Sequence, residues 1–475
     1  MKRRQLYAEK GDFMETEKKR SSFTGKIGFV LAAAGSAVGL GNIWRFPYLA
    51  AKYGGGIFLL VYIALALTFG FTLMVAEIAI GRKTQTSALG AFKKLDKRFS
   101  FIGILASIVP IIILPYYSVI GGWVLKYLFG FVANNTVEMA GDSYFTGFIG
   151  TAGEPLLWFA LFVGLTALVV LLGVDKGIEK VSKFMMPALV VLILFIAIYS
   201  MATLDGAGAG VAYYLKPDFS KFSVMTVVGA MGQLFYSMSL AMGIMITYGS
   251  YMKKDVNIES SAHQIEIFDT VVAFLAGLMI IPAVYAFSGG DEAALAQKGP
   301  GLMFITLPKI FETMPGGAVI GAVFFIMVFF AALTSSISLM ETVVSIVQDR
   351  LKIDRKICLV IVLGICALLG IPSSLGFSVW ESFTVLGLSI LDFFDFITNS
   401  VLMPLVALAT AIFIGYFLKP KAVVDEIELP EDEGGTGAKF KLKGLFEIVI
   451  RYVAPVFLVA ILVSSILDVF GVIKI

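Results

Sequence analysis

The sequence contains few of the side chains that bind transition metals or form disulfides. Its 475 residues include one histidine, His263, and two cysteines, Cys358 and Cys366. A zinc site or a histidine-based catalyst needs several such side chains close together. Both cysteines lie in one apolar segment, and we expect them to pack as small hydrophobic side chains without forming a disulfide. The composition therefore argues against a metalloenzyme, a histidine-dependent enzyme or a disulfide-stapled domain.

Charged residues are scarce as well, at 15% of the chain compared with about a quarter in soluble domains. Hydrophobic residues make up 58%, and the mean hydropathy is +0.91. Apolar runs of about 20 residues, long enough to cross the hydrocarbon core of a bilayer, recur from end to end. We therefore predict an all-α polytopic membrane protein. Its eleven predicted spans lie near residues 24–51, 56–80, 101–129, 155–173, 182–204, 222–251, 264–288, 317–348, 357–372, 380–417 and 446–470.

The distribution of basic residues predicts the orientation of these spans. The first twenty or so residues are polar and charged, without the apolar stretch of a cleavable signal peptide. Lys and Arg are frequent in this tail and in alternate connections, whereas the connections at 131–154 and 373–379 contain none. This alternation follows the positive-inside rule. We therefore expect an integral cell-membrane protein with a cytoplasmic tail over residues 1–22 and, after an odd number of spans, a C-terminus outside.

The stretch GSAVGLGNIWRFP, residues 35–47, interrupts the first apolar run. Glycine costs about 1 kcal/mol in a helix interior and proline about 3 kcal/mol, and an arginine at bilayer depth costs a few kcal/mol more. Close helix packing could explain Gly35 and Gly39, but it leaves Asn42 and Arg45 unexplained. Non-helical backbone at membrane depth is tolerated where it is buried in protein or lines a polar cavity. We therefore predict an unwound segment whose free carbonyls suit a hard cation and whose amides suit an anion.

The span at residues 232–251 is marked in a similar way, because Ser237, Ser239 and Gly243 lie at its middle. Serine often only bonds its own helix, so this composition alone is a weak signal. The two marked spans are the first and the sixth, so each of two groups of five spans would begin with an interrupted helix. This arrangement indicates an inverted-repeat transporter with its site between the interrupted helices. The expected parts are repeats at 23–204 and 205–418, then a cytoplasmic loop and the eleventh span at 419–475.

Polar side chains also gather in the eighth predicted span. Thr334 and Ser338 share one helix face, with Ser335 beside them. Their hydroxyls and the carbonyl of Ala331 could complete a cation site begun by the unwound segment. Acidic residues within the apolar runs are functional candidates too, although some of them could merely brace neighbouring helices. These acids are Glu77, Asp269, Glu341, Asp392 and Asp395.

Several stretches of the sequence together resemble the neurotransmitter:sodium symporter family. The resemblance lies in GSAVGLGNIWRFPY of the first span, PYYS of the third, GQLFYSMSL of the sixth, ALTSSIS of the eighth and LDFFD of the tenth. It covers about residues 20–470, and eleven spans instead of twelve resemble the short bacterial members. It implies the leucine-transporter fold, with two inverted five-helix repeats and interrupted helices 1 and 6.

The resemblance implies two sodium sites. The ligands of the first would be the Ala37 carbonyl, Asn42, Ser237, Asp269 and the substrate's own carboxylate. The ligands of the second would be the carbonyls of Gly35, Val38 and Ala331 with the hydroxyls of Thr334 and Ser335.

A substrate site and two gates are also implied. The residues that would bind the substrate are Ala37, Leu40, Gly41, Ile113, Tyr117, Ile120, Tyr236, Ser237, Ser239, Met242 and Leu339. The resemblance assigns the outer gate to Arg45 with Asp395, the inner gate to Arg20 with Asp349, and support of the unwound backbone to Glu77.

Three positions depart from the family pattern and refine the expectation. Ser237 replaces a common threonine, Tyr236 replaces a common phenylalanine, and Asp269 stands where several members have asparagine. Asp269 adds a fixed negative charge at the first sodium site, which predicts transport without chloride. Amine-transporting relatives carry an aspartate at the position of Gly39, so the glycine leaves room for the carboxylate of an α-amino acid. The adaptable Met242 and the aromatic Tyr236 predict a hydrophobic or aromatic substrate.

We therefore predict sodium-coupled symport of an α-amino acid into the cell by alternating access, with two Na⁺ ions as coupled ions. The expected partners are the substrate, Na⁺ and the lipid bilayer, and no nucleic acid. A sodium-coupled transporter of another small solute, a passive channel, and a sensor of the same fold that binds without transporting remain alternatives. A membrane enzyme would need a nucleophile–base pair or metal ligands, and the sequence shows neither.

Overall fold

A computed structural model describes residues 21–290 and 300–469, and every regular element in these ranges is a helix. Nine of the described helices are long and apolar enough to cross a membrane. Their bounds are Gly56–Thr84, Lys97–Val132, Gly153–Leu171, Val174–Thr203, Ile258–Phe287, Gly317–Leu351, Arg355–Leu375, Ile390–Leu418 and Lys443–Leu467. The all-α polytopic membrane fold predicted from the sequence is thereby confirmed.

Two further spans are interrupted. Helix α2 (Lys26–Ala37) is followed by η1 (Gly41–Arg45) and α3 (Phe46–Lys52), with a bend of 54° at the break. Helix α13 (Val224–Ser237) ends well before α14 begins (Ile244–Ser250). With these two spans the described chain contains the eleven predicted ones, and the interruptions lie in the first and the sixth, as predicted.

The tenth span begins later than predicted. The apolar run suggested a start near residue 380, but the helix starts with α20 (Ile390–Asp395). The residues before it form turns, in which Leu386 and Gly387 adopt positive φ angles of 55° and 77°. A helix cannot pass through left-handed backbone, so Trp380 and Phe383 are exposed side chains of a loop rather than parts of the span.

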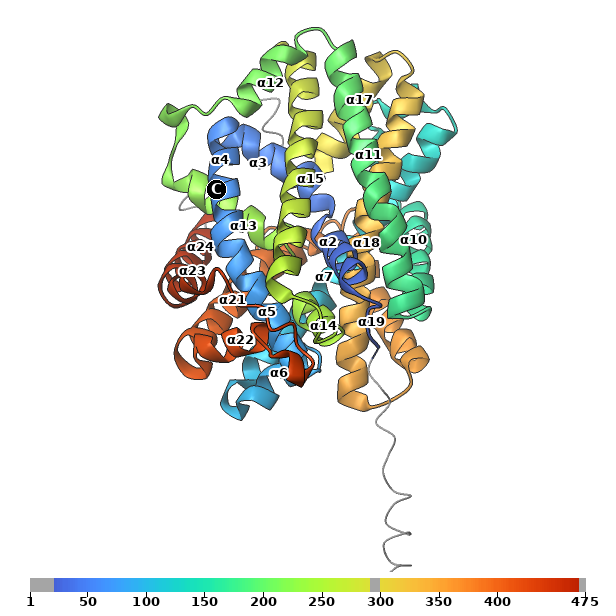
Figure 1. Ribbon diagram of the computed structural model, residues 1–475. Coiled ribbons are helices and arrows are strands. Elements are labelled where there is room, and N and C mark those ends of the chain that lie inside the picture. Colours follow the sequence, from blue (N-terminus) through green and yellow to red (C-terminus); the bar gives the residue numbers. More distant parts are fainter. Residues whose placement is uncertain (1–20, 291–299, 470–475) are drawn as a thin grey trace, which may run out of the picture.

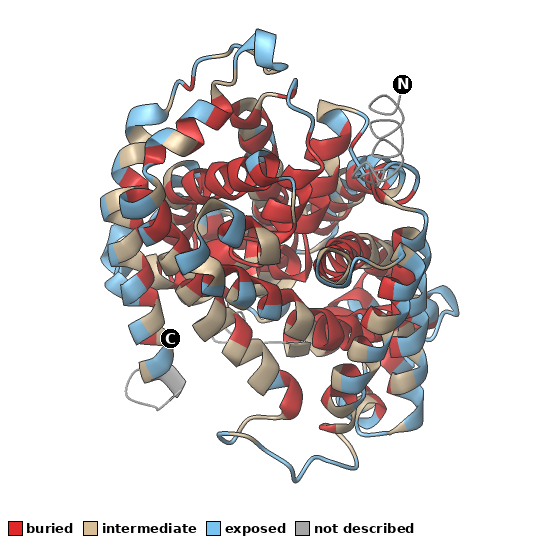
Figure 2. Cartoon of the chain, turned by 90° about the horizontal axis from the view of Figure 1, so that it is seen from below, coloured by how far each residue is buried: buried red, intermediate tan, exposed pale blue. Residues whose placement is uncertain are grey.

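Residues in the middle of the bundle are buried by other parts of the protein, and many residues on its outer surface are apolar. Figure 2 shows buried residues gathered in the middle of the bundle and exposed ones around its rim. Helix α10 (Gly153–Leu171) lies at the rim, and its Leu157, Leu161, Leu165 and Leu168 are 57%, 47%, 38% and 61% exposed. Leucines at this helical spacing that face outward fit contact with lipid chains.

One end of the bundle carries many of the basic connections, and we refer to it as the basic end. It contains the ends of α5 (Phe71–Thr84) and α14, and the short helices α6 (Ala88–Leu95) and α22 (Pro420–Ile427) (Figure 1). Its basic side chains include Lys83, Lys93, Lys94, Lys254 and Lys421. The opposite end contains α12 (Ala207–Leu215) and α17 (Leu307–Thr313) (Figure 1).

Candidate functional site

The break after α2 exposes backbone carbonyls that converge on one side chain. Ser335 Oγ, on α18 (Gly317–Leu351), lies 3.4 Å from the Gly35 oxygen, 3.1 Å from the Ser36 oxygen and 3.2 Å from the Val38 oxygen. A hydroxyl donates one hydrogen, so it can satisfy only one of these three acceptors at a time. The surplus of buried oxygen atoms suits a hard monovalent cation.

Two further oxygens of α18 lie beside this group. Thr334 Oγ1 lies 3.2 Å from the Ala331 oxygen, and a Cβ atom added at Gly35 would be 3.2 Å from Thr334 Cβ. The absence of a side chain at Gly35 therefore lets α2 approach the threonine closely. The structure thus brings together Gly35, Val38, Ala331, Thr334 and Ser335, and adds the Ser36 carbonyl, which the sequence did not single out. We refer to these six residues as the second oxygen cluster.

A first oxygen cluster joins the unwound segment to α13 and α15 (Ile258–Phe287). Asn42 Nδ2 donates to Asp269 Oδ1 at 2.7 Å and to Ser237 Oγ at 3.0 Å, and Ser237 Oγ donates to Asp269 Oδ2 at 2.8 Å. All three side chains are buried. Tyr62 completes the cluster, because its hydroxyl lies 3.2 Å from Ser237 Oγ and 3.3 Å from Asp269 Oδ2.

The Asn42 amide is turned differently from the sequence-based expectation. Its oxygen accepts from Gly39 N at 3.1 Å, and its NH₂ group faces Ser237 and Asp269. The amide would have to rotate before its oxygen could meet a cation beside Asp269. Ala37, the remaining predicted member of this site, lines the neighbouring cavity.

A cavity of about 30 Å³ lies between the two oxygen clusters and reaches both, since Asn42 and Ser335 are in its wall. Nine of the predicted substrate-binding residues line it: Ala37, Leu40, Gly41, Ile113, Tyr117, Tyr236, Ser239, Met242 and Leu339. Ile120 and Ser237 do not line it, although both are buried. Ser36 and Ile244 line it without having been predicted. The cavity is therefore the place where most of the predicted substrate residues meet both oxygen clusters.

Polar groups for a carboxylate lie at one wall of this cavity. The Leu40 amide lies 3.3 Å from the Tyr117 hydroxyl. A Cβ atom added at Gly39 would lie 3.0 Å from that hydroxyl and 2.7 Å from Ser335 Oγ. A side chain at position 39 would therefore occupy the space between Tyr117 and Ser335, which agrees with the expectation that the glycine keeps this space open.

The interruption of the sixth span is held in a strained backbone. Ser239 and Ala241 have positive φ angles of 53° and 60°, which are costly for residues with a Cβ atom. Glu77 on α5 accepts a hydrogen bond from Ala241 N at 2.7 Å, and Ser239 Oγ donates to the Ser36 oxygen at 2.9 Å. These bonds satisfy backbone groups that an unbroken helix would have satisfied itself. Glu77 thus contacts the unwound backbone, on the sixth span.

The two predicted outer-gate residues, Arg45 and Asp395, form no ion pair with each other within the described chain. The Arg45 guanidinium lies over the Tyr236 ring, 5.2 Å from its centroid. Asp395 accepts from Tyr116 Oη at 3.2 Å and from Asn399 Nδ2 at 2.6 Å. The described chain therefore shows no direct ion pair between Arg45 and Asp395 in this conformation, and their role as the outer gate stays a prediction.

At the basic end, α14 closes against α18. Tyr248 Oη donates to Ser338 Oγ at 2.8 Å, and Tyr251 Oη donates to Glu341 Oε1 at 2.8 Å. Glu341 also pairs with both terminal nitrogens of Arg355, a partner that the sequence did not suggest.

Of the inner gate residues predicted at this end, Asp349 accepts from Ser87 N at 2.6 Å. Arg20 lies outside the described residues.

Sequence reasoning missed two buried residues of the site. Tyr62 is one of many aromatic residues in apolar helices, and no local pattern distinguishes it. Gln233 is different, because it is a lone amide in an apolar span and could have been noticed. Its Nε2 donates to the Gly41 oxygen at 3.0 Å and so supports the start of η1.

Known proteins match this chain over most of its length. The model of the Sodium:neurotransmitter symporter family matches residues 20–147 and 143–472. The sodium-dependent transporter YhdH of Bacillus subtilis is 35% identical over 461 residues, which cover 95% of this chain and 99% of that protein. The human sodium- and chloride-dependent taurine transporter is 29% identical over 406 residues, covering 74% of this chain and 65% of that one.

A similar structure is also known. The crystal structure of MhsT in complex with L-phenylalanine matches with a TM-score of 0.84 and 38% sequence identity, and the match covers 94% of this chain and 100% of that one.

Proposed function

The chain is a sodium-dependent transporter that belongs to the Sodium:neurotransmitter symporter family, and we propose that it imports an α-amino acid together with two Na⁺ ions. One observation carries this proposal: a single buried cavity adjoins both oxygen clusters. A substrate carboxylate in this cavity would lie beside a cation at Asn42 and Asp269. Each would then stabilise binding of the other, which is the coupling that symport requires.

We place the basic end, with the N-terminus, in the cytoplasm, and the C-terminus outside. The concentration of Lys and Arg at that end supports this orientation through the positive-inside rule. We propose that Tyr236, which lines the cavity, closes it on one side and that the contact of α14 with α18 closes it on the other. Alternating access then requires that these two closures open in turn. An inner gate between Arg20 and Asp349 and an outer gate between Arg45 and Asp395 remain our assignments for them.

A hydrophobic or aromatic amino acid is the substrate we propose. Met242, Ile113 and Leu339 give the cavity apolar walls, and Tyr236 offers an aromatic face. Met242 is unbranched and can change rotamer to enlarge the cavity. MhsT, whose sequence is 38% identical to this chain, has been crystallised in complex with L-phenylalanine, which supports the same class of substrate here.

The proposed stoichiometry moves two net charges into the cell with each zwitterionic substrate. At about 2.3 kcal/mol per charge per 100 mV, the membrane potential contributes about 4.6 kcal/mol. This free energy alone sustains a concentration ratio of about a thousandfold. We further propose that chloride is not required, because Asp269 already supplies a negative charge beside the first cation.

Uptake into proteoliposomes tests this function. We expect accumulation of labelled L-phenylalanine or L-leucine above the external concentration when Na⁺ is outside, and none when K⁺ replaces it. In competition, unlabelled tryptophan, tyrosine, leucine and methionine should inhibit more strongly than glycine or alanine. Binding without accumulation would favour a sensor, and uptake that only equilibrates would favour a channel. Stronger inhibition by glycine would contradict the proposed side-chain preference.

The outer gate yields a separate prediction. Asp395→Ala should lower sodium-driven uptake about tenfold or more. Without this carboxylate, Arg45 would have no acidic partner when the outer gate closes over Tyr236. The thermal midpoint should change little, since Asp395 is only half-buried and its partners Tyr116 and Asn399 stay hydrogen-bonded to each other without it. Asp392→Ala is the matched control: Asp392 lies on the same short helix, is exposed, and accepts from Ser389. Equal uptake by the two variants would rule out this gate.

A further inference from the structure

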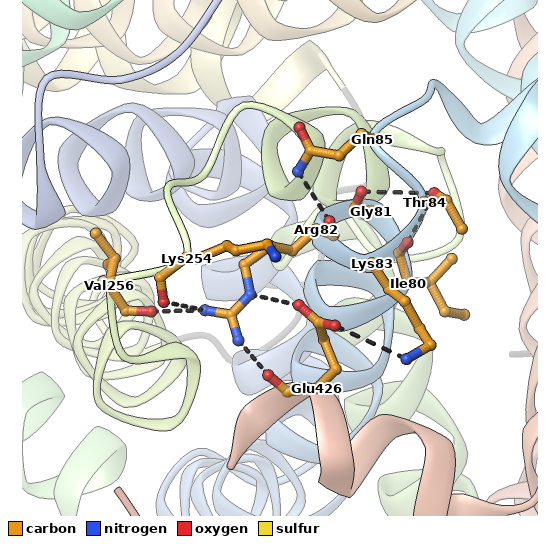
Figure 3. Close-up of polar contacts among 9 residues, drawn as sticks. All are labelled: Ile80, Gly81, Arg82, Lys83, Thr84, Gln85, Lys254, Val256 and Glu426. Atoms are coloured by element: carbon orange, nitrogen blue, oxygen red, sulfur yellow. Dashed lines mark hydrogen bonds and ion pairs between the residues drawn. The ribbon is translucent and has the colours of Figure 1, made fainter. Parts of the chain in front are cut away.

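Arg82, the third residue from the end of α5, is almost fully buried, with 2% of its surface exposed. Its Nε donates to Glu426 Oε1 at 2.8 Å, and its Nη2 donates to the Glu426 backbone oxygen. Its Nη1 donates to the backbone oxygens of Val256 at 2.7 Å and Lys254 at 3.3 Å. Figure 3 shows how the guanidinium joins these groups. Neither the proposed ion sites nor the proposed gates use this cluster.

The cluster fastens a connecting segment to the rest of the bundle. Glu426 lies on α22, within the linker between the tenth and eleventh spans, and is 6% exposed. The same linker is held a second time, because the Glu259 carboxylate of α15 accepts from Lys441 N at 3.2 Å and Leu442 N at 3.3 Å. The linker is therefore a docked part of the basic end.

Arg82 also belongs to a unit that includes α14, the second half of the sixth span. A Cβ atom added at Gly249 would lie 2.9 Å from Ile78 Cα, and one added at Gly81 would lie 3.0 Å from Ile246 Cα. Such close backbone contact leaves α14 little freedom to slide along α5. Two of the three carbonyls that Arg82 binds, those of Lys254 and Val256, lie in the short connection between α14 and α15. Helices α5 and α14 thus pack as one unit, the α5–α14 wall, and α14 supplies Ile244 to the cavity.

The linker is tied to the other wall as well. It continues from the tenth span, whose α20 and η7 (Phe396–Leu402) pack against α7 (Ser100–Val132). Helix α7 supplies Ile113 and Tyr117 to the cavity. The bond between Arg82 and Glu426 therefore connects the α5–α14 wall to the α7 wall through the linker.

We propose that Arg82 and Glu426 form a latch that holds the basic end closed and sets how often it opens. To open a path there, α14 must leave α18 and the α5–α14 wall must move away from the α7 wall. The latch resists this movement, since separation would leave the buried Glu426 carboxylate without Arg82, and Arg82 with backbone oxygens as its only partners in this cluster. This inference rests on the proposed transport cycle, because only a protein that opens at this end needs such a latch.

A reporter cysteine tests the latch in the purified full-length protein in nanodiscs. Ser338→Cys places a thiol in the α14–α18 contact, where it is buried while the basic end is closed. The rate of its modification by N-ethylmaleimide is followed by peptide mass spectrometry. Adding Glu426→Gln should raise this rate about fivefold or more, since the variant loses a buried charge pair that is made while the basic end is closed. Asp425→Asn, an exposed neighbour on α22, is the matched control and should leave the rate unchanged.

The chain supplies its own control for unfolding. Cys366 is buried in α19 (Arg355–Leu375), outside the α14–α18 contact, and should stay protected while the reporter reacts faster. Equal acceleration at both positions would show a merely structural role and overturn the proposal, as would an unchanged reporter rate.

If Glu426→Gln does not yield folded protein, Arg82→Lys is measured in its place with the same expected result. Lysine lacks the guanidinium group whose nitrogens bind three backbone carbonyls. Labelling requires no substrate, so a failure of the proposed amino-acid transport would be seen separately in the uptake assay.

Discussion

Replacing Thr334 and Ser335 together by alanine is expected to abolish sodium-driven uptake while the protein still inserts into the membrane. The double variant removes both side-chain oxygens of the second oxygen cluster and leaves only backbone carbonyls. Interactions between a charged group and a hydroxyl contribute about 1.5–3 kcal/mol each. The apparent sodium affinity should therefore fall by about a hundredfold or more. Uptake at graded Na⁺ concentrations measures this change.

Ser336→Ala is the matched control for that experiment. Ser336 is adjacent in α18, is equally buried, and its hydroxyl lies 3.2 Å from Thr166 Oγ1 on α10 instead of facing the cluster. Its loss should leave the sodium dependence unchanged. Normal uptake with normal sodium dependence in the double variant would remove Thr334 and Ser335 from the site.

The interruption of the first span could be predicted from the sequence because its signal is local, whereas that of the sixth was inferred mainly from its place five spans later. Glycine, asparagine, arginine and proline at the centre of an apolar run each carry a cost that an unbroken helix cannot absorb. The start of the tenth span could not be predicted in this way, because Trp380 and Phe383 continue the apolar run while the turn at Leu386 depends on a backbone angle.

The assembly of the site depended on the family resemblance. The contact of Ser335 with Gly35 joins residues 300 positions apart, and no spacing rule connects them. The contact between the two latch residues could be predicted from the sequence even less. Arg82 and Glu426 are separated by 344 residues, and from the sequence alone each is one of many charged residues in a connecting segment. Only the fold reveals that both charges are buried and face one another.

Replacing Asp269 by asparagine is expected to weaken sodium binding about thirtyfold or more. A cation about 4 Å from a carboxylate is attracted by about 4 kcal/mol at an effective dielectric constant near 20, and half of that energy already corresponds to about thirtyfold in affinity. Asp269 is buried and bonded to Asn42 and Ser237, so its charge is held at the first oxygen cluster. Equilibrium ²²Na⁺ binding with and without substrate measures the change.

Glu266→Gln distinguishes a local effect from a general loss of charge in α15. Glu266 is also buried, one turn nearer the basic end, but makes no hydrogen bond to the cluster within the described chain. If Asp269 only braces its helix, both variants should bind sodium as the wild type does. If its charge holds the cation, Asp269→Asn should lose much more affinity than Glu266→Gln.

The same charge predicts how the protein responds to chloride. A transporter that depends on chloride can use the anion to offset the charge of its bound cations, whereas a fixed carboxylate at that place makes a mobile anion unnecessary. Wild-type uptake should therefore be undiminished when gluconate replaces chloride on both sides of the proteoliposome membrane. In Asp269→Asn, where the cluster has lost its charge, added chloride should restore part of the lost sodium affinity. Loss of wild-type uptake without chloride would contradict this account, because the carboxylate would then not be replacing the anion.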